Sequence, residues 1–156
     1  MTGINSMGRI DEHLEELKKN IPDCVLETGS YNDQDFAVVK ADKILDICRF
    51  FKDRLGFDFL TDVCGAHFPE REYPFEIIFH LYSFKRNERV RLKIRLKDGD
   101  EAPSVSSVWR SADWNEREIF DMFGIRFSGH TDLRRILMPE EYNEFPLRKD
   151  FPVQGR

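Results

Sequence analysis

Two neighbouring stretches of the sequence decide the fold: Phe75-Glu76-Ile77-Ile78-Phe79-His80-Leu81-Tyr82 and Arg89-Val90-Arg91-Leu92-Lys93-Ile94-Arg95-Leu96-Lys97. In each, every second side chain is large and apolar, which is the period of a β-strand. The turn-forming residues Lys85-Arg86-Asn87 between them predict a hairpin. The first stretch is apolar on much of both faces, which favours a central position in a sheet.

Five further elements precede this hairpin. Apolar residues at helical spacing predict one helix that ends at Pro22 and a second that begins with Asp42 as N-cap and ends at Gly56. The turn residues Tyr31-Asn32-Asp33 separate two short strands and predict another hairpin. From Phe57 a period of two predicts a strand in which Phe57, Phe59, Thr61 and Val63 alternate with Asp58, Leu60 and Asp62.

The predicted order is helix, two strands, helix, three strands, helix and tail. Such a mixture indicates an α+β fold, a two-layer sandwich of a mixed, largely antiparallel sheet with helices on one face. An extended C-terminal arm follows. We therefore divide the chain into an α+β domain, residues 1–110, and a capped helix with a docking arm, residues 111–156.

Composition restricts the possible functions. The chain has 156 residues, a net charge of −5 and three cysteines without a CxxC pair, so a disulfide framework, a zinc or iron–sulfur site and a general nucleic-acid binder are all disfavoured. The first 20 residues lack the apolar core of a signal peptide, and no window has the roughly 20 apolar residues that cross a bilayer. Any membrane association is expected to come through a partner.

The sequence offers few catalytic candidates. The nearest approach to a metal or nucleophile cluster is Asp62, Cys64, His67 and Glu70. A Cys-His pair can activate a thiolate, but this spacing fits no familiar ligand set and no third group orients the pair, so we set this interpretation aside. His13 and His80 are single histidines, and phosphate-binding glycine loops are absent from the sequence. We predict no catalytic, cofactor-binding or metal-binding residues in this chain.

The strand from Arg89 to Lys97 carries five cations on one face. One interpretation is a solvated outer sheet face balanced by nearby acids. The other is a docking surface for an acidic partner or a nucleic-acid backbone. The first is favoured, because half-exposed antiparallel sheets commonly carry polar faces and this stripe has no aromatic residue for base stacking.

The last predicted helix has clear end signals. Asp113 is expected to cap it, Glu116 completes a capping box, and Gly124 ends it. Arg117 and Asp121 stand four residues apart and are expected to pair.

The segment from Phe127 to Arg156 has no sustained period and contains three prolines, yet it is rich in apolar residues and arginine. A disordered tail would be polar, so this arm is expected to lie against a surface. Its own domain is one candidate. A partner protein is favoured, because arginine beside apolar anchors is typical of interfaces.

Four strings in this region resemble a known family: Glu116 to Ile125, Gly129-His130, Asp132 to Leu137, and Pro146 to Pro152. They are similar to the 30 kDa subunit of respiratory complex I, an NADH:quinone oxidoreductase. The family signature is a Glu-Arg-Glu triplet followed by an acid, two apolar residues, a His and an Arg, and it is met in full. Thr131 and Glu144-Phe145 depart from the family pattern, so the turn before Pro146 is expected to differ.

The resemblance implies a non-catalytic, hydrophilic subunit of the peripheral arm in a hetero-oligomer. Its partners would be the quinone-site subunit of the 49 kDa type and the iron–sulfur subunits, which would hold NADH, FMN, iron–sulfur clusters and quinone. Together with the absence of an import peptide, the resemblance implies that the subunit is held peripherally on the cytoplasmic side of the cell inner membrane. The residues expected at subunit interfaces are Glu116, Arg117, Glu118, Asp121, Phe123, His130, Leu133, Arg134, Arg135, Ile136, Leu137, Leu147, Arg148, Lys149 and Asp150.

Two alternatives remain open from the sequence. One is the equivalent subunit of a related membrane-bound hydrogenase or another quinone-reducing dehydrogenase. The other is a nucleic-acid-binding module that uses the basic strand. We expect Arg134→Ala, or truncation before Leu133, to impair assembly of the complex and to leave the isolated domain folded.

Overall fold

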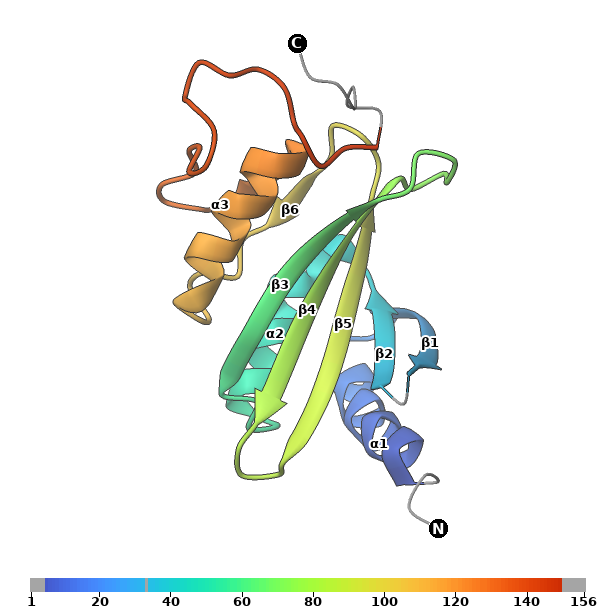
Figure 1. Ribbon diagram of the computed structural model, residues 1–156. Coiled ribbons are helices and arrows are strands. Elements are labelled where there is room, and N and C mark those ends of the chain that lie inside the picture. The colour runs from blue at the N-terminus through green and yellow to red at the C-terminus, as the bar shows by residue number, and fades with distance from the viewer. Residues whose placement is uncertain (1–4, 33, 150–156) are drawn as a thin grey trace.

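The computed structural model describes residues 5–32 and 34–149 (Figure 1). The elements within them are α1 (Asn5–Asn20), β1 (Val25–Tyr31), β2 (Gln34–Val39), a 3-10 turn (Ala41–Lys43), α2 (Ile44–Asp53), β3 (Phe59–His67), β4 (Phe75–Ser83), β5 (Glu88–Leu96), β6 (Glu101–Pro103), α3 (Ser111–Phe123) and β7 (Arg126–Ser128).

Within these described residues, five strands form one sheet in the order β1-β2-β5-β4-β3. β4 and β5 pair antiparallel over their whole length, from Phe75 opposite Leu96 to Ser83 opposite Glu88, which confirms the predicted hairpin. β1 and β2 form the second predicted hairpin, with Asn32 at a φ of 52° in its turn. β2 is parallel to β5, so the sheet is mixed, as predicted. A separate pair, β6 and β7, is parallel.

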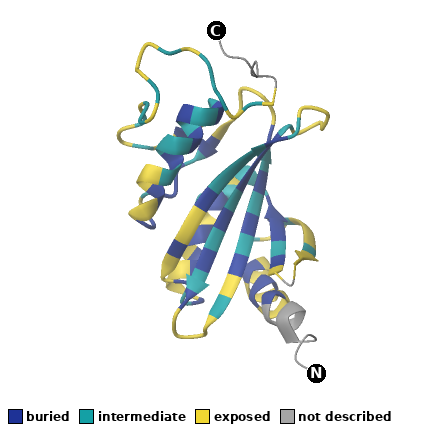
Figure 2. Cartoon of the chain, viewed as in Figure 1, coloured by how far each residue is buried: buried dark blue, intermediate teal, exposed yellow. Residues whose placement is uncertain are grey.

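The helices pack on one face of the sheet, and Figure 1 shows α2 behind β3 and β4, with α1 beside β2 and α3 toward the far end of β3. Figure 2 shows buried and less buried residues alternating along β4 and β5, as the period of two requires. The inward side chains of β5, from Val90 to Leu96, are buried in the same apolar cluster as residues of all three helices. The predicted α+β sandwich is confirmed. This cluster runs from Ile10 to Phe127 and includes residues of α3. The division of the chain into residues 1–110 and 111–156 stays a prediction.

β3 differs from its predicted pattern. A register shift between Leu60 and Asp62 inserts an extra residue opposite β4, which is a β-bulge. The bulge reverses the phase of the alternation, so Leu60 and Val63 are buried, whereas Phe59 and Thr61 are exposed. The prediction that Phe59, Thr61 and Val63 share one face was wrong.

The start of α2 also differs. Asp42 lies within the 3-10 turn, Lys43 is the N-cap, and no side chain caps either element, so the predicted Asp42 cap was wrong. The helix ends at Asp53 with Arg54 as C-cap, so Gly56 lies one residue beyond the C′ position predicted for it. Gly56 has a φ of +80°, and the Phe57 amide donates to the Phe51 carbonyl. In the part of the chain that the structure describes, no helix combines the length and apolarity needed to span a bilayer.

Candidate functional site

Helix α3 is the platform for the C-terminal arm. Its residues Ala112, Ile119 and Phe123 are buried, and it packs on β3 at Gly65. A Cβ at Gly65 would lie 2.8 Å from the Phe123 ring, so glycine allows this close approach. Phe123 therefore belongs to the core of this chain.

The first turn of α3 does not have the predicted capping box. The helix begins at Ser111, its N-cap Arg110 makes no side-chain cap, and Asp113 lies inside the first turn. Glu116 is buried. It accepts hydrogen bonds from the Ser104 hydroxyl (2.6 Å) and the Val105 amide (2.8 Å), which fasten the loop after β6 to the helix. Burial raises the pKa of this carboxyl, although both hydrogen bonds oppose that change.

The spacing of residues in the sequence already places Glu116 on the inward face of α3. It stands four residues after Ala112, three before Ile119 and seven before Phe123, which is the spacing of one helical face. The capping-box interpretation ignored this spacing.

His130 and Asp113 hold the start of the arm. The imidazole of His130 has no exposed surface, and its Nδ1 accepts a hydrogen bond from the Asp132 amide at 3.0 Å. The proton therefore sits on Nε2, which lies 2.9 Å from the Asp113 carboxylate. Asp113 thus anchors the arm rather than the helix N-terminus.

Asp121 is the main attachment point of the arm. One carboxylate oxygen pairs with Arg135 at 2.9 Å, and the other accepts the backbone amides of Ile136 (3.2 Å), Leu137 (2.6 Å) and Met138 (3.0 Å). Burial alone would raise the pKa of Asp121, but these four hydrogen bonds together lower it. The predicted Arg117–Asp121 pair was wrong, because the arm supplies the cation.

The arm also bonds three of the four carbonyl groups at the C-terminus of α3. The C-cap Gly124 amide bonds the Phe120 carbonyl, and the arm bonds those of Asp121 through Arg135, of Met122 through the Leu147 amide and of Phe123 through Arg148. These are the last four carbonyls of the helix, which have no partner within a helix. Two arginines at this end also complement the helix dipole.

Gly124 joins helix and arm. Its φ is +79°, as the predicted helix end requires, and a Cβ there would lie 2.8 Å from the ring of Phe145. The guanidinium groups of Arg135 and Arg148 lie 4.7 and 5.2 Å from the same ring. Phe145, which departs from the family pattern, is therefore the apolar centre around which the arm folds back.

The residues of the nucleophile candidate are far from a catalytic arrangement. His67 stacks on Phe75 and accepts the Lys149 amide at 2.9 Å, so it fastens the end of the arm to β3. Cys64 donates to Asp62, and burial together with this carboxylate raises the pKa of its thiol to about 12. Over residues 5–32 and 34–149, no group of three or more His, Cys, Asp or Glu side chains could hold a metal ion.

The arm exposes two large apolar side chains among its polar residues. Leu137 and Leu147 are 61% and 55% exposed, and Arg134 contacts only the exposed Asp132 among its described ion pairs. The sequence favoured a partner protein over the chain's own domain as the surface that the arm covers. In the structure, the arm lies on its own domain and also presents an outer surface to which a partner could bind.

The predicted interface residues fall into two groups. Glu116 and Asp121 have no exposed surface and Phe123 is buried, so in this structure these three belong to the platform under the arm, and their place at an interface stays a prediction. Arg117 donates to the Arg134 carbonyl and Glu118 accepts from Trp114, both near the surface. Leu133 and Ile136 are half-buried, and Asp150 lies outside the described residues.

The basic face of β5 is partly neutralised. Lys93 lies 3.6 Å and Arg95 3.6 Å from the buried carboxylate of Glu76, and Arg95 also pairs with Glu27 at 3.1 Å. This supports the interpretation of a balanced sheet face for that half of the strand.

Comparisons with known proteins match this arrangement. The family model described as "Respiratory-chain NADH dehydrogenase, 30 Kd subunit" matches residues 37–156. A subunit of the NADH-quinone oxidoreductase of Rhizobium etli (strain CIAT 652) is 48% identical over 142 residues, covering 89% of this chain and 75% of the relative.

Two solved structures are also similar. A trypsin-resistant fragment of Nqo5 has a TM-score of 0.66 and 27% identity, over 80% of this chain and 99% of that chain. A chain of the membrane-bound sulfane sulfur reductase, an archaeal respiratory membrane complex, has a TM-score of 0.77 and 25% identity, over 93% of this chain and 86% of that chain. The family model covers most of the sequence, and the Rhizobium etli subunit is 48% identical. The chain therefore belongs to the family of 30 kDa subunits of the respiratory-chain NADH dehydrogenase.

Proposed function

We propose that this chain is a structural subunit of the peripheral arm of a proton-translocating NADH:quinone oxidoreductase, with no catalytic site of its own. Its C-terminal arm docks on the quinone-site subunit of the 49 kDa type and on the iron–sulfur subunits. NADH, FMN, the iron–sulfur clusters and quinone bind in those partners. The chain is held peripherally on the cytoplasmic side of the inner membrane through them.

The observation that carries this proposal is the orientation of the arm. Asp121 and the end of α3 hold its backbone by hydrogen bonds, so the arm has a defined shape before a partner arrives. A preformed shape lowers the entropy cost of association. The exposed Leu137, Leu147 and Arg134 then supply the apolar anchors and the cation that are typical of interfaces.

The test is replacement of Leu137 by serine in a cell that makes no other form of this chain. Leu137 is 61% exposed, so folding of this chain should be unaffected, whereas the assembled complex in the membrane should decrease severalfold. Leu26→Ser is the matched control, because Leu26 on β1 is 59% exposed and lies outside the arm.

The readouts are native electrophoresis of the membranes and quinone-dependent oxidation of NADH. Equal amounts of complex with Leu137→Ser and Leu26→Ser would contradict the role of the arm. Arg134→Ala should behave like Leu137→Ser, because its only described ion pair is with the exposed Asp132.

Truncation before Leu133 is a poorer test than the sequence suggested. It would remove Arg135, Leu147 and Arg148, and so leave buried Asp121 and the last carbonyls of α3 without their partners. The isolated domain would then lose stability itself, and loss of assembly could not be assigned to the interface.

The similarity to the sulfane sulfur reductase chain favours a second candidate: the equivalent subunit of another respiratory membrane complex. The first candidate is better supported, because the relative from Rhizobium etli is 48% identical and that chain is 25% identical. Purification of the complex that contains this chain, followed by assay with NADH as electron donor, separates the two. Quinone reduction without any response to NADH would favour the second.

A further inference from the structure

The cations on the outer face of β5 form two groups with different surroundings. Lys93 and Arg95 face the carboxylate of Glu76. Arg89 and Arg91, toward the β4–β5 hairpin, have no carboxylate within ion-pair distance among the described residues. Arg91 donates only to backbone carbonyls, and its buried Nε has no hydrogen-bond partner in the part of the chain that the structure describes. Within β5, the cations without a carboxylate at ion-pair distance among the described residues therefore lie at the hairpin end of the strand.

Exposed aromatic rings lie beside Arg89, the outer of these two arginines. Phe84 is 64% and Phe59 46% exposed, and their rings meet edge to face with centroids 5.6 Å apart. Phe84 also contacts Tyr82 at 4.8 Å, and the Arg89 guanidinium lies 5.7 Å from the Tyr82 ring. The bulge in β3 places Phe59 on this outer face. We call Phe59, Tyr82 and Phe84 the aromatic patch.

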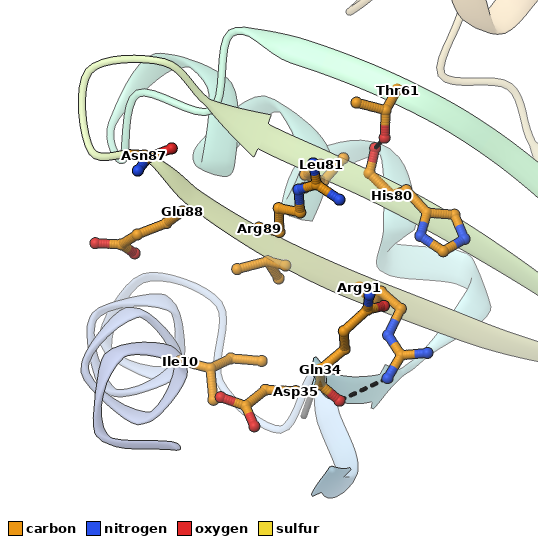
Figure 3. A pocket seen from close by; sticks show the side chains of 11 residues that line it. Ile10, Gln34, Asp35, Thr61, His80, Leu81, Asn87, Glu88, Arg89 and Arg91 are labelled. Atoms are coloured by element: carbon orange, nitrogen blue, oxygen red, sulfur yellow. Dashed lines mark hydrogen bonds between the residues drawn. The ribbon is translucent and has the colours of Figure 1, made fainter. Parts of the chain in front are cut away.

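A cavity of about 360 Å³ adjoins the aromatic patch (Figure 3). Its lining includes Thr61 of β3, His80 of β4, both Arg89 and Arg91, and, at the side of α1, Asp35. Burial lowers the pKa of His80, so this imidazole is neutral at neutral pH. A neutral imidazole has one nitrogen that donates a hydrogen bond and one that accepts. The cavity thus offers two guanidinium groups and an imidazole beside an apolar surface.

Two acids also line this cavity. The carboxylate of Glu88 lies 2.7 Å from Nε2 of His13. Asp35 is buried, which raises its pKa, and one of its oxygens has no partner among the described residues. Both lie on the side of α1, as Figure 3 shows, whereas Arg89, His80 and Thr61 lie on the opposite side. The positive side of the cavity is the side that continues into the aromatic patch.

We propose that this end of the outer sheet face, at Arg89, Arg91 and the aromatic patch, binds an acidic segment of a neighbouring subunit. A carboxylate of that segment is received by the two arginines, and an adjacent apolar side chain packs on Phe59 and Phe84. The inference rests on the proposed function for the identity of the neighbour as a subunit of the same complex. It adds a second docking surface, at the opposite end of the sheet from α3 and the arm (Figure 1).

A protein partner fits these observations better than a nucleic acid. A nucleic-acid backbone needs a continuous row of free cations, and here the row stops at Lys93, which faces Glu76. The net charge of −5 also opposes binding of a polyanion. Arginine next to exposed aromatic rings is the composition of the centre of a protein interface.

The test uses the assembled complex purified from native membranes. Phe84 is replaced by the photo-reactive analogue p-benzoylphenylalanine, the complex is irradiated, and cross-linked peptides are identified by mass spectrometry. The matched control is the same replacement of Leu26, which is 59% exposed at the opposite end of β1 from the contact with Arg91. The expected product joins position 84 to a segment of another subunit that contains Asp or Glu, and no such product forms from position 26.

Charge dependence is tested by combining the label with Arg89→Gln or Arg89→Lys. The yield of the cross-link should fall severalfold with Arg89→Gln and be retained with Arg89→Lys, because lysine keeps the charge. The inference is overturned by an equal yield with Arg89→Gln, by no product at position 84, or by a product with a segment without acids, with a second copy of this chain or with nucleic acid. Absence of this chain from the purified complex would instead overturn the proposed function.

Discussion

Replacement of Asp121 by asparagine isolates the contact that shapes the arm. The side chain has no exposed surface and accepts one hydrogen bond from Arg135 and three from backbone amides. Asparagine keeps one acceptor oxygen and puts an NH2 group in place of the other. In either orientation, this NH2 group faces groups that are themselves donors, so at least one of them loses its partner.

The expected magnitude follows from the burial of the ion pair. Removing one partner of a buried pair costs about 3–5 kcal/mol. Arg135 keeps carbonyl acceptors on Asp121 and Glu144, so the lower end, about 3 kcal/mol, applies. Since each 1.4 kcal/mol changes an equilibrium about tenfold, opening of the arm should become roughly 10²-fold more favourable. The domain core, which Asp121 does not enter, should keep most of its stability.

Hydrogen exchange measures this opening directly. The amides of Ile136, Leu137 and Met138 should exchange roughly 10²-fold faster in Asp121→Asn, with little change in β4 and β5. Asp132→Asn is the matched control, because Asp132 pairs with Arg134 at the surface, where such pairs contribute about 0–1 kcal/mol. Unchanged exchange in Asp121→Asn, or equal acceleration in both variants, would refute the reasoning.

The same contact predicts the effect of acid. The pKa of Asp121 in the folded chain lies below its ordinary value of 3.8, because the hydrogen bonds outweigh burial. A lowered carboxyl pKa stabilises the arm fully above the ordinary value, and this contribution is lost as the pH falls through the folded-state pKa. Protection of the three amides should therefore persist on acidification to about pH 4 and decline below it.

Three further changes test other parts of the platform. Burial raises the pKa of Glu116, so its ionisation opposes folding as the pH rises above 4.5; Glu116→Gln should therefore gain stability relative to the wild type as the pH rises above this value in urea unfolding. Gly124→Ala should cost more than Gly99→Ala in thermal unfolding: both have positive φ, worth about 1–2 kcal/mol, but only Gly124 has an aromatic ring against it. The thiol of Cys64, whose pKa is raised to about 12, should react slowly with iodoacetamide at pH 7.5, and Asp62→Asn should speed the reaction.

The sheet could be predicted because its signals are local. Alternation in β4 and β5 is uninterrupted, and the turn before Glu88 is made of turn-forming residues, so strand positions and pairing follow from the sequence. The bulge in β3 could not be predicted in this way, because an inserted residue changes the phase without changing the composition. Its consequence, an exposed Phe59, is visible only in the structure.

The arm shows the opposite limit. Its composition predicts that it lies against a surface, and Leu137 is available for that role. The attachment through Asp121 joins residues 14 to 17 positions apart without any periodic pattern, so no rule of local structure indicates it. The local rule instead paired Asp121 with Arg117, since residues four apart on a helix can meet. Tertiary contacts with Arg135 and the backbone amides prevailed over that pairing.

The parallel pairing of β2 with β5 sets the order in which this chain can complete its fold. β2 ends at Val39, and its neighbour in the sheet begins at Glu88, so the pairing must close a loop of about 50 residues. While the chain is being synthesised, the segment from α1 to α2 has no strand to complete its sheet until β4 and β5 have left the ribosome. The β4–β5 hairpin, which is local in sequence, is therefore expected to form first and to act as the template on which the N-terminal hairpin docks.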